Sequence, residues 1–401
     1  MGSPALPMSP LRHLGHGPDH GQRLARLEHL QCPVTGRALR LDRAWPRSVG
    51  HLLLEYFDDE AETTVAGQWF AEPGRLAEVA GKTAPPGATG AVATIDGAGV
   101  LLQRGGADRR LIALRPLLDD PAATLVVHRP ERRAVVRVAR PGATSYLKVV
   151  RPGRLAAPVS GPLVVGCARL RTPRLLSHDI ARGTMAYGEL AGRSLHQLLG
   201  DRAVPEAEVV SSWQATGAAV RHLHAVAPPA GTGTHDAGAE AAVVGRWVDH
   251  ALGHRALAPD LVQPVKRALA SVEARLAAVR PPERLSLVHR DLHDKQVLVT
   301  DSSDGGAARV GALDLDTVAL GDPAVDVANL LVHLQLRVLQ GHCTPGLAAA
   351  AGDAFLDGYR PGPAASRRLV AYAGATRLRL ACVYAFRPRW SALAEPLLAP
   401  V

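Results

Sequence analysis

The stretch from Leu285 to Leu331 constrains the fold and chemistry of this chain more than any other. An apolar run, LSLV, leads into HRDLHDKQ and then into the β-rich run VLVT. The turn DSSDGG separates this strand from a second one, RVGALDLD, and GDP with an apolar helix follows. Strand, glycine-rich turn and strand predict a hairpin, so Asp291 at its entrance and Asp314 at its exit can lie side by side. Two carboxylates with an amide between them suit a divalent cation that carries a phosphorylated nucleotide.

The polar side chains of this stretch have roles that fit phosphoryl transfer. Asp291 stands in a loop, where a carboxylate can orient a substrate hydroxyl and accept its proton. Asp314 at a strand end can hold Mg²⁺ between nucleotide phosphates, and Gln296 can add an amide oxygen to the same ion. Asp316 either shares the face of Asp314 and touches the ion or simply leaves the strand. Asp294 and the residue after it are expected to belong to a solvated loop.

One lysine in a predicted strand stands out, because the chain otherwise uses arginine. RAVVRVA and TSYLKVV form a predicted hairpin, and alternation along the second strand places Lys148 on the face of Tyr146 and Val150. Lys148 is then either a solvated charge on an edge strand or an ammonium group aimed at the α- and β-phosphates of a nucleotide.

The chain as a whole predicts an α+β protein with several parts, since 401 residues exceed one ordinary core. Residues 1–45 are expected to be a largely disordered or irregular segment with one short helix candidate, QRLARLEHL. Residues 46–120 contain two predicted hairpins and a short helix, which suggest an additional N-terminal α+β module. Residues 121–189 are β-rich, and residues 190–401 are mainly helical.

Composition and charge argue against several classes of protein. The formal net charge of +9 comes from scattered arginines, and only 4% of the residues are aromatic, so no nucleic-acid partner is expected. Binding to nucleic acid through the basic surface would predict a steep salt dependence. Apolar runs are too short to cross a bilayer, and no secretion signal is visible. The four cysteines lack metal-ligand or redox spacing. A cytoplasmic protein without membrane contact is therefore expected.

The motif pair HRDLHDKQVLV and ALDLDTVALGDPAVDVANLL resembles the catalytic loop and metal site of the aminoglycoside phosphotransferase and choline kinase-like family. That signature reads H-G-D-L-H-x-x-N and then I-D-x-x-x-x-x-x-G-D-P-x-x-D-L-A. The resemblance implies a two-lobed protein kinase-like fold, with ATP and Mg²⁺ as cofactors and a small hydroxylated molecule as substrate. It also implies roles for individual residues: Asp291 as the catalytic aspartate, Gln296 and Asp314 as metal ligands, Lys148 as the phosphate-binding lysine, Glu189 in the hinge at the nucleotide, Asp326 as a brace of the catalytic loop, and His289 in support of it.

The chain departs from the family pattern at three points. Arg290 replaces the usual glycine, and Gln296 replaces the usual asparagine with one more methylene. No glutamate occurs between Val149 and Gly188, so the usual helix partner of the lysine is missing. Another acid, such as Asp179, then takes its place, or the lysine is held differently.

Two functions remain open at this stage. The first is a kinase that transfers the γ-phosphoryl group of ATP to a hydroxyl of a sugar, an aminoglycoside or another natural product. Residues 191–288 contain no acidic cluster for a cationic aminoglycoside, so a neutral acceptor is at least as good a candidate. The alternative is a catalytically impaired, nucleotide-binding pseudokinase with a regulatory or scaffold role. The missing glutamate and Gln296 favour it, whereas Asp291 and Asp314 oppose it. The oligomeric state and the choice of ATP over GTP stay open.

Overall fold

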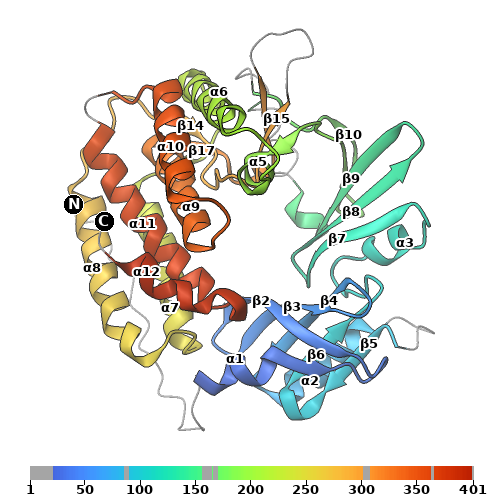
Figure 1. Cartoon of the computed structure of the whole chain (residues 1–401). Coiled ribbons are helices and arrows are strands. Elements are labelled where there is room, and N and C mark those ends of the chain that lie inside the picture. The colour runs from blue at the N-terminus through green and yellow to red at the C-terminus, as the bar shows by residue number, and fades with distance from the viewer. Residues whose placement is uncertain are drawn as a thin grey trace.

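The computed structural model describes residues 21–84, 90–155, 165, 170–300, 308–362 and 365–399. A six-stranded sheet, a five-stranded sheet and a helical region with two small sheets follow one another along the chain. The six-stranded sheet lies next to both other parts, at the bottom of the view in Figure 1. None of the helices within these ranges is long and apolar enough to span a membrane.

The six-stranded sheet has the strand order β1-β2-β3-β4-β6-β5, and its strands pair antiparallel. Its elements are α1 (Gly21–Glu28), β1 (His29–Gln31), β2 (Ala38–Ser48), β3 (His51–Asp58), β4 (Thr63–Phe70), α2 (Pro73–Thr83), β5 (Val92–Ile95), η1 (Asp96–Ala98) and β6 (Val100–Gln103). The two predicted hairpins are present as β3–β4 and β5–β6, and the predicted short helix as α2.

This sheet begins earlier in the chain than predicted. The segment expected to be irregular up to residue 45 contains α1, β1 and most of β2, and the boundary at residue 46 falls inside β2. Strand β2 is ordered because Leu39 and Leu41 alternate with polar residues and are buried. The first twenty residues, for which disorder was expected, lie outside the described ranges.

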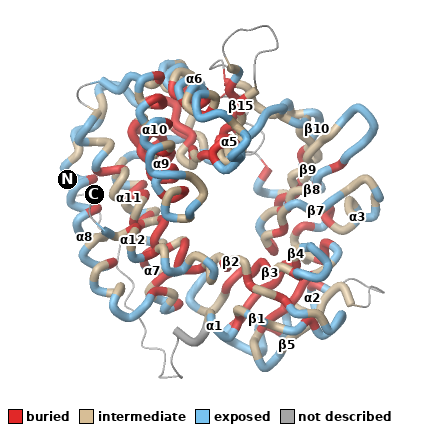
Figure 2. Tube along the Cα trace, in the orientation of Figure 1, coloured by how far each residue is buried: buried red, intermediate tan, exposed pale blue. Residues whose placement is uncertain are grey.

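The six-stranded sheet shares a hydrophobic core with the helical region. Leu52 and Leu54 of the sheet belong to the same buried cluster as Val244 and Phe386 of the helical region, and Figure 2 shows buried segments on both sides of this contact. The backbone amide of Ala44 also donates a hydrogen bond of 2.8 Å to the carbonyl of Phe386. The sheet is therefore fixed to the helices by apolar burial and by backbone pairing.

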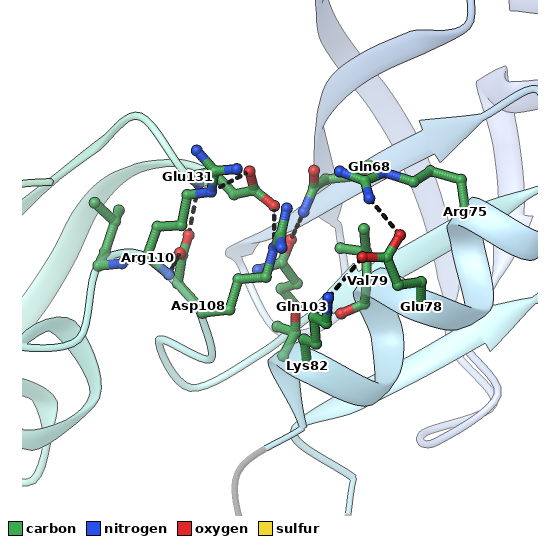
Figure 3. A network of polar contacts seen from close by, with 12 residues as sticks. Gln68, Arg75, Glu78, Val79, Lys82, Gln103, Asp108, Arg110 and Glu131 are labelled. Atoms are coloured by element: carbon green, nitrogen blue, oxygen red, sulfur yellow. Dashed lines mark hydrogen bonds and ion pairs between the residues drawn. The ribbon is translucent and has the colours of Figure 1, made fainter.

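A polar network also joins the six-stranded sheet to the five-stranded sheet (Figure 3). Gln68 on β4 donates a hydrogen bond of 2.7 Å to Gln103 on β6. Past the end of β6, Asp108 accepts a hydrogen bond of 2.7 Å from the backbone amide of Glu131. The carboxylate of Glu131 pairs with Arg110 at 3.0 Å. Since Gln68, Gln103 and Glu131 are buried, these polar groups satisfy one another and hold the two sheets in a defined orientation.

The five-stranded sheet has the order β10-β11-β9-β8-β7, which makes β9 its central strand. The elements of this part are α3 (Leu114–Leu118), β7 (Ala123–Arg129), β8 (Arg133–Arg140), β9 (Ala143–Val150), η2 (Pro152–Arg154), β10 (Leu175–Asp179) and β11 (Thr184–Gly188). The predicted hairpin around Arg140–Ala143 is confirmed as β8–β9. Residues 156–164 and 166–169 lie outside the described ranges.

The helical region carries the stretch that holds both sequence motifs. Its elements are β12 (Arg193–Ser194), α5 (Leu195–Gly200), α6 (Glu206–Ala225), β13 (Thr234–His235), α7 (Ala237–Gly253), η4 (Pro259–Leu261), α8 (Val262–Ala278), β14 (Ser286–Val288), β15 (Val297–Thr300), β16 (Arg309–Ala312), η5 (Leu315–Thr317), β17 (Ala319–Gly321), α9 (Ala324–Leu339), α10 (Pro345–Tyr359), α11 (Ala365–Tyr384), η6 (Pro388–Leu393) and α12 (Ala394–Leu398). Ser194 caps α5 in a reciprocal capping box with Gln197. The expected α+β class and the division into β-rich and helical parts are confirmed.

Candidate active site

The hairpin predicted between the two motifs is formed by β15 and β16. They pair antiparallel from Val297 opposite Ala312 to Thr300 opposite Arg309. The pairing continues past the strand ends, because the backbone amide of Leu313 donates a hydrogen bond of 2.9 Å to the carbonyl of Gln296. The loop that contains Asp291 thus enters the hairpin where the segment with Asp314 leaves it. The turn itself, residues 301–307, lies outside the described ranges.

Asp326 braces the loop that contains Asp291, as the resemblance implied. It lies in the first turn of α9, and its fully buried carboxylate accepts hydrogen bonds of 2.7 Å from the backbone amides of His289 and Arg290. His224 on α6 donates a third, of 3.1 Å. Burial raises the pKa of Asp326, but the hydrogen bond and charge of His224 outweigh it and keep this pKa below its usual range. The brace therefore remains an acceptor for the loop amides.

Arg290 shows why the related loops usually have glycine at this position. Its φ of 71° lies in the left-handed region, which glycine adopts with less strain than other residues. The backbone amide of Arg290 is held by Asp326, and its guanidinium donates a hydrogen bond of 3.1 Å to the carbonyl of Thr317. These contacts hold arginine in this conformation.

Asp294 is a second buried acid of the loop, and the expectation of a solvated residue was wrong. Arg337 donates two hydrogen bonds to it, of 2.7 and 2.8 Å, and His196 donates a third of 2.8 Å. Burial raises the pKa of Asp294, but these partners outweigh it and hold the pKa well below its ordinary value. Sequence reasoning missed Arg337 because it lies on α9, far along the chain from the loop. Its spacing from Asp326 along the helix, three turns, is the signal that could have indicated a shared face.

Asp291 and Gln296 leave oxygen atoms available for a ligand. The side-chain amide of Gln296 donates a hydrogen bond of 3.4 Å to a carboxylate oxygen of Asp291. The amide oxygen of Gln296 is buried and accepts no hydrogen bond from any residue that the structure describes. A buried acceptor without a partner is costly, and hard cations such as Mg²⁺ prefer oxygen ligands. The residues present therefore fit the expected metal site.

Asp314 and Asp316 face two cations of the five-stranded sheet. Lys148 donates a hydrogen bond of 3.2 Å to Asp314 and another to Asp316. Arg133 donates hydrogen bonds of 3.2 Å to both carboxylate oxygens of Asp314. Burial raises the pKa of Asp314, but the charges of Arg133 and Lys148 outweigh it and lower the pKa to about 2. Asp316 lies beyond the end of β16, which was one of the two predicted alternatives. Its carboxylate still faces Lys148.

These contacts show where Lys148 lies and which acids it meets. Its side chain is 12% exposed on the central strand β9, so the solvated edge position is wrong. Asp179 is not its partner: it ends β10, and its side chain accepts a hydrogen bond of 3.0 Å from the amide of Arg182. Asp314 and Asp316 pair with Lys148 instead.

Arg133 is a site residue that sequence reasoning missed. It lies on β8, two residues before Val135, which pairs with Lys148 on β9. Side chains two residues apart on a strand share a face, so Arg133 and Lys148 point the same way. The strand alternation that placed Lys148 could have identified Arg133 as well.

Glu189 lies in the link between β11 and β12, at the position that the resemblance assigns to the hinge. Its side chain is exposed, and its backbone amide donates a hydrogen bond of 3.2 Å to the carbonyl of Thr144. It takes no part in the contacts among Lys148, Asp314 and Asp316.

Comparisons with known proteins identify the family of the chain. A model of the "Phosphotransferase enzyme family" matches residues 117–369 of the chain. The solved structure of aminoglycoside phosphotransferase APH(4)-Ia is similar at a TM-score of 0.50 with 17% identity, covering 69% of this chain and 92% of that one. Aminoglycoside phosphotransferase APH(3'')-Id from Streptomyces rimosus matches at a TM-score of 0.49 with 20% identity, covering 67% of this chain and 98% of that one. A choline/ethanolamine kinase family protein from Mesorhizobium loti matches at 0.47 with 19% identity, covering 71% and 91%. No curated protein matches the chain.

The family match extends from the start of the five-stranded sheet into α11 and includes both motifs and Lys148. The likeness to APH(4)-Ia supports the two-lobed protein kinase-like fold. On the family match, the chain belongs to the phosphotransferase enzyme family.

Proposed function

We propose that this phosphotransferase moves the γ-phosphoryl group of ATP to a hydroxyl of a small molecule. The observation that carries the proposal is the buried amide oxygen of Gln296, which has no hydrogen-bond partner among the described residues. The NH2 group of the same side chain contacts Asp291, and the backbone carbonyl of Gln296 pairs with Leu313, the residue before Asp314. In a purely structural loop, such an oxygen would accept a hydrogen bond from the protein. Here it suits a cation that arrives with the nucleotide.

Gln296 and Asp314 are the residues that would hold Mg²⁺. When bound, the ion would neutralise charge on the nucleotide phosphates. Lys148 and Arg133 would supply positive charge to the same phosphates from the sheet side of the site. Both cations already lie on the face of the sheet that meets Asp314. Glu189, in the link between the lobes, would lie at the nucleotide base.

Asp291 would act on the acceptor. Its partly exposed carboxylate can accept a hydrogen bond from the acceptor hydroxyl and orient its oxygen. As the new bond from that oxygen to the γ-phosphorus forms, the bond from the γ-phosphorus to the leaving oxygen of ADP breaks. The hydroxyl proton passes to Asp291. The brace from Asp326 keeps the loop backbone in place during this step.

Each part of the chain would have a different role in this reaction. Residues 121–189 would bind the nucleotide, and residues 190–401 would provide the catalytic loop, the metal ligands and the acceptor site. The additional α+β module before residue 120 would act as a cap. In the structure its sheet contacts the helical region through β2 and the five-stranded sheet through β3.

The test combines binding and turnover. We expect ATP to raise the melting temperature only when Mg²⁺ is present, and we expect ADP release in the presence of a panel of hydroxylated compounds. The substitution Asp291→Asn should abolish this turnover and leave Mg²⁺-ATP binding intact. The matched control is Asp260→Asn, at an exposed acid of η4.

Binding of Mg²⁺-ATP without any turnover that depends on Asp291 would contradict the proposal. That result would favour the alternative of a nucleotide-binding pseudokinase with a regulatory or scaffold role.

A further inference from the structure

A cavity of about 370 Å³ opens beside the catalytic loop. Lys295 of the loop forms part of its wall, together with His196 on α5 and His342 after α9. Arg387 and Arg389 line it from the end of the helical region, and Arg43 lines it from β2. The volume is within the range of cavities that bind small molecules, about 300–1,000 Å³.

The position of the cavity connects it with the acceptor side of the proposed reaction. Lys295 directly precedes Gln296, whose amide contacts the carboxylate of Asp291. His196 in the cavity wall donates a hydrogen bond of 2.8 Å to the buried Asp294 of the same loop. The wall and the loop therefore form one connected unit. A larger hollow of about 960 Å³, beside Trp69 of the six-stranded sheet, contains no residue of this loop.

The cavity wall carries an excess of positive charge. Among the described residues that line it, four are cationic, namely Arg43, Lys295, Arg387 and Arg389, and one, Asp42, is acidic. The carboxylate of Asp42 accepts a hydrogen bond of 3.0 Å from Arg43, which also pairs with Glu55 at 2.8 Å. Asp42 and Glu55 thus pair with Arg43, and neither of them forms an ion pair with the other three cations.

Aromatic rings hold two of these three cations in place without neutralising them. Arg387 lies over the ring of Tyr384 at 4.3 Å, and Arg389 over the ring of Trp390 at 4.8 Å. Lys295, Arg387 and Arg389 make no ion pair with any carboxylate in the described ranges. A bound anion would compensate this crowding of positive charge.

The six-stranded sheet completes the cavity. Asp42 and Arg43 come from β2, and the next residue, Ala44, donates its backbone hydrogen bond to Phe386, next to Arg387. The backbone pairing thus brings the β2 wall against the Arg387 wall. This gives the additional N-terminal module a direct part in the acceptor site.

We infer that this cavity binds the acceptor and that the acceptor carries an anionic group, a carboxylate or a phosphate, that contacts Lys295, Arg387 and Arg389. The inference rests on the proposed function for the reaction itself, and on the composition of the cavity for the charge of the substrate. A cationic aminoglycoside would meet like charges on the wall, which oppose binding. The transferred phosphoryl group would go to a hydroxyl of the anionic molecule, with the proton accepted by Asp291 as above.

Binding without nucleotide tests the charge preference directly. The probes are hexoses matched in scaffold and different in charge: glucuronate, glucose 6-phosphate, neutral glucose and cationic glucosamine, with inorganic phosphate as the smallest anion. We expect titration calorimetry to show binding of the anions and at least about tenfold weaker binding of glucose and glucosamine, because charge-assisted hydrogen bonds are lost. Comparing glucuronate with glucose 6-phosphate decides between a carboxylate and a phosphate.

Substitutions then locate the binding to the cavity. Lys295 and Arg389 are exposed, so Lys295→Gln and Arg389→Gln should leave the fold intact, which the melting temperature checks. Each should weaken binding of the anionic hexoses by about tenfold or more and leave the Kd of Mg²⁺-ATP unchanged. The matched control is Arg182→Gln, at a surface arginine with a side chain 77% exposed in the turn before β11.

Three outcomes of these binding experiments would contradict the inference. It fails if glucose or glucosamine binds as tightly as the anions, if the two substitutions leave anion binding unchanged, or if no anionic probe binds at about 10 mM. These failures differ from failure of the proposed function. Turnover of glucosamine that requires Asp291 would retain the kinase and reject the anionic acceptor, whereas anion binding without ATP turnover would retain the cavity and reject the kinase.

Discussion

Two pairs of aspartates within one stretch of sequence differ in what surrounds them. Asp294 and Asp326 are fully buried, and protein donors satisfy their carboxylates. Asp291 and Asp314 are partly exposed, and they lie beside an unpartnered amide oxygen and beside two cations of the other lobe. The first pair has the surroundings of structural acids, and the second pair those of acids that meet a ligand. The comparison teaches that motif position alone does not separate the two roles, whereas burial and donor count do.

The largest expected effect comes from breaking the buried pair of Asp294. Arg337→Leu leaves this carboxylate buried with only His196 as a side-chain donor, and we expect the free energy of unfolding to fall by about 3–5 kcal/mol. Urea unfolding measures the change. The matched control is Arg246→Leu, at an exposed arginine of α7, for which a change within about 0.5 kcal/mol is expected.

Removing both charges sharpens this prediction. The double substitution Asp294→Leu with Arg337→Leu should recover part of the loss, because no unpaired charge then remains buried. Wild-type stability of Arg337→Leu would mean that the buried carboxylate of Asp294 does not need Arg337. The structural role assigned to this pair would then be wrong.

The next effect concerns the exposed pair. Asp314→Asn should lower ATP turnover by about 100-fold or more, which corresponds to about 2.7 kcal/mol, because an electrostatic contribution to the transition state is lost. Its free energy of unfolding should fall by less than in Arg337→Leu, since Asp314 is partly exposed whereas Asp294 is fully buried. ADP release and urea unfolding on the same protein measure both quantities.

The control for this second prediction is Asp353→Asn, at an exposed acid of α10, which should change neither quantity. A loss of stability in Asp314→Asn as large as that in Arg337→Leu would show that both pairs are structural. That result would contradict the distinction between a structural pair and a ligand-binding pair.

The smallest effect is a pH dependence. The folded-state pKa of Asp294 is depressed, so the unfolded chain binds more protons and stability rises with pH in the acid range. This contribution is fully present above the ordinary carboxyl pKa of about 4 and is lost as pH falls below it, by at most about 1.4 kcal/mol per pH unit. Asp294→Asn should show a flatter dependence between about pH 5 and pH 3 in urea unfolding. An unchanged slope would argue that Asp294 is not ionised in the fold.

Much of the fold was predictable because its signals are local. The hairpins β3–β4, β5–β6, β8–β9 and β15–β16 follow from alternation and turn residues, and the cap of α5 follows from Ser194. The start of the six-stranded sheet was missed, since proline and glycine nearby obscured the alternation in β2. The role of Asp326 as a brace was predicted from the motif, whereas the burial of Asp294 depends on Arg337, which lies more than forty residues away.

The sequence by itself determined which residue types are available for the proposed site: an acid in a loop, an amide and an acid at the two ends of a hairpin, and a lysine in a strand. These depend on residue type and short spacing. Only the tertiary structure decided which acids face Lys148, which cations line the cavity beside the loop, and that β2 of the N-terminal module completes the cavity. The physical reason is that pairing of charges across lobes depends on packing between distant elements, and local sequence patterns contain no record of that packing.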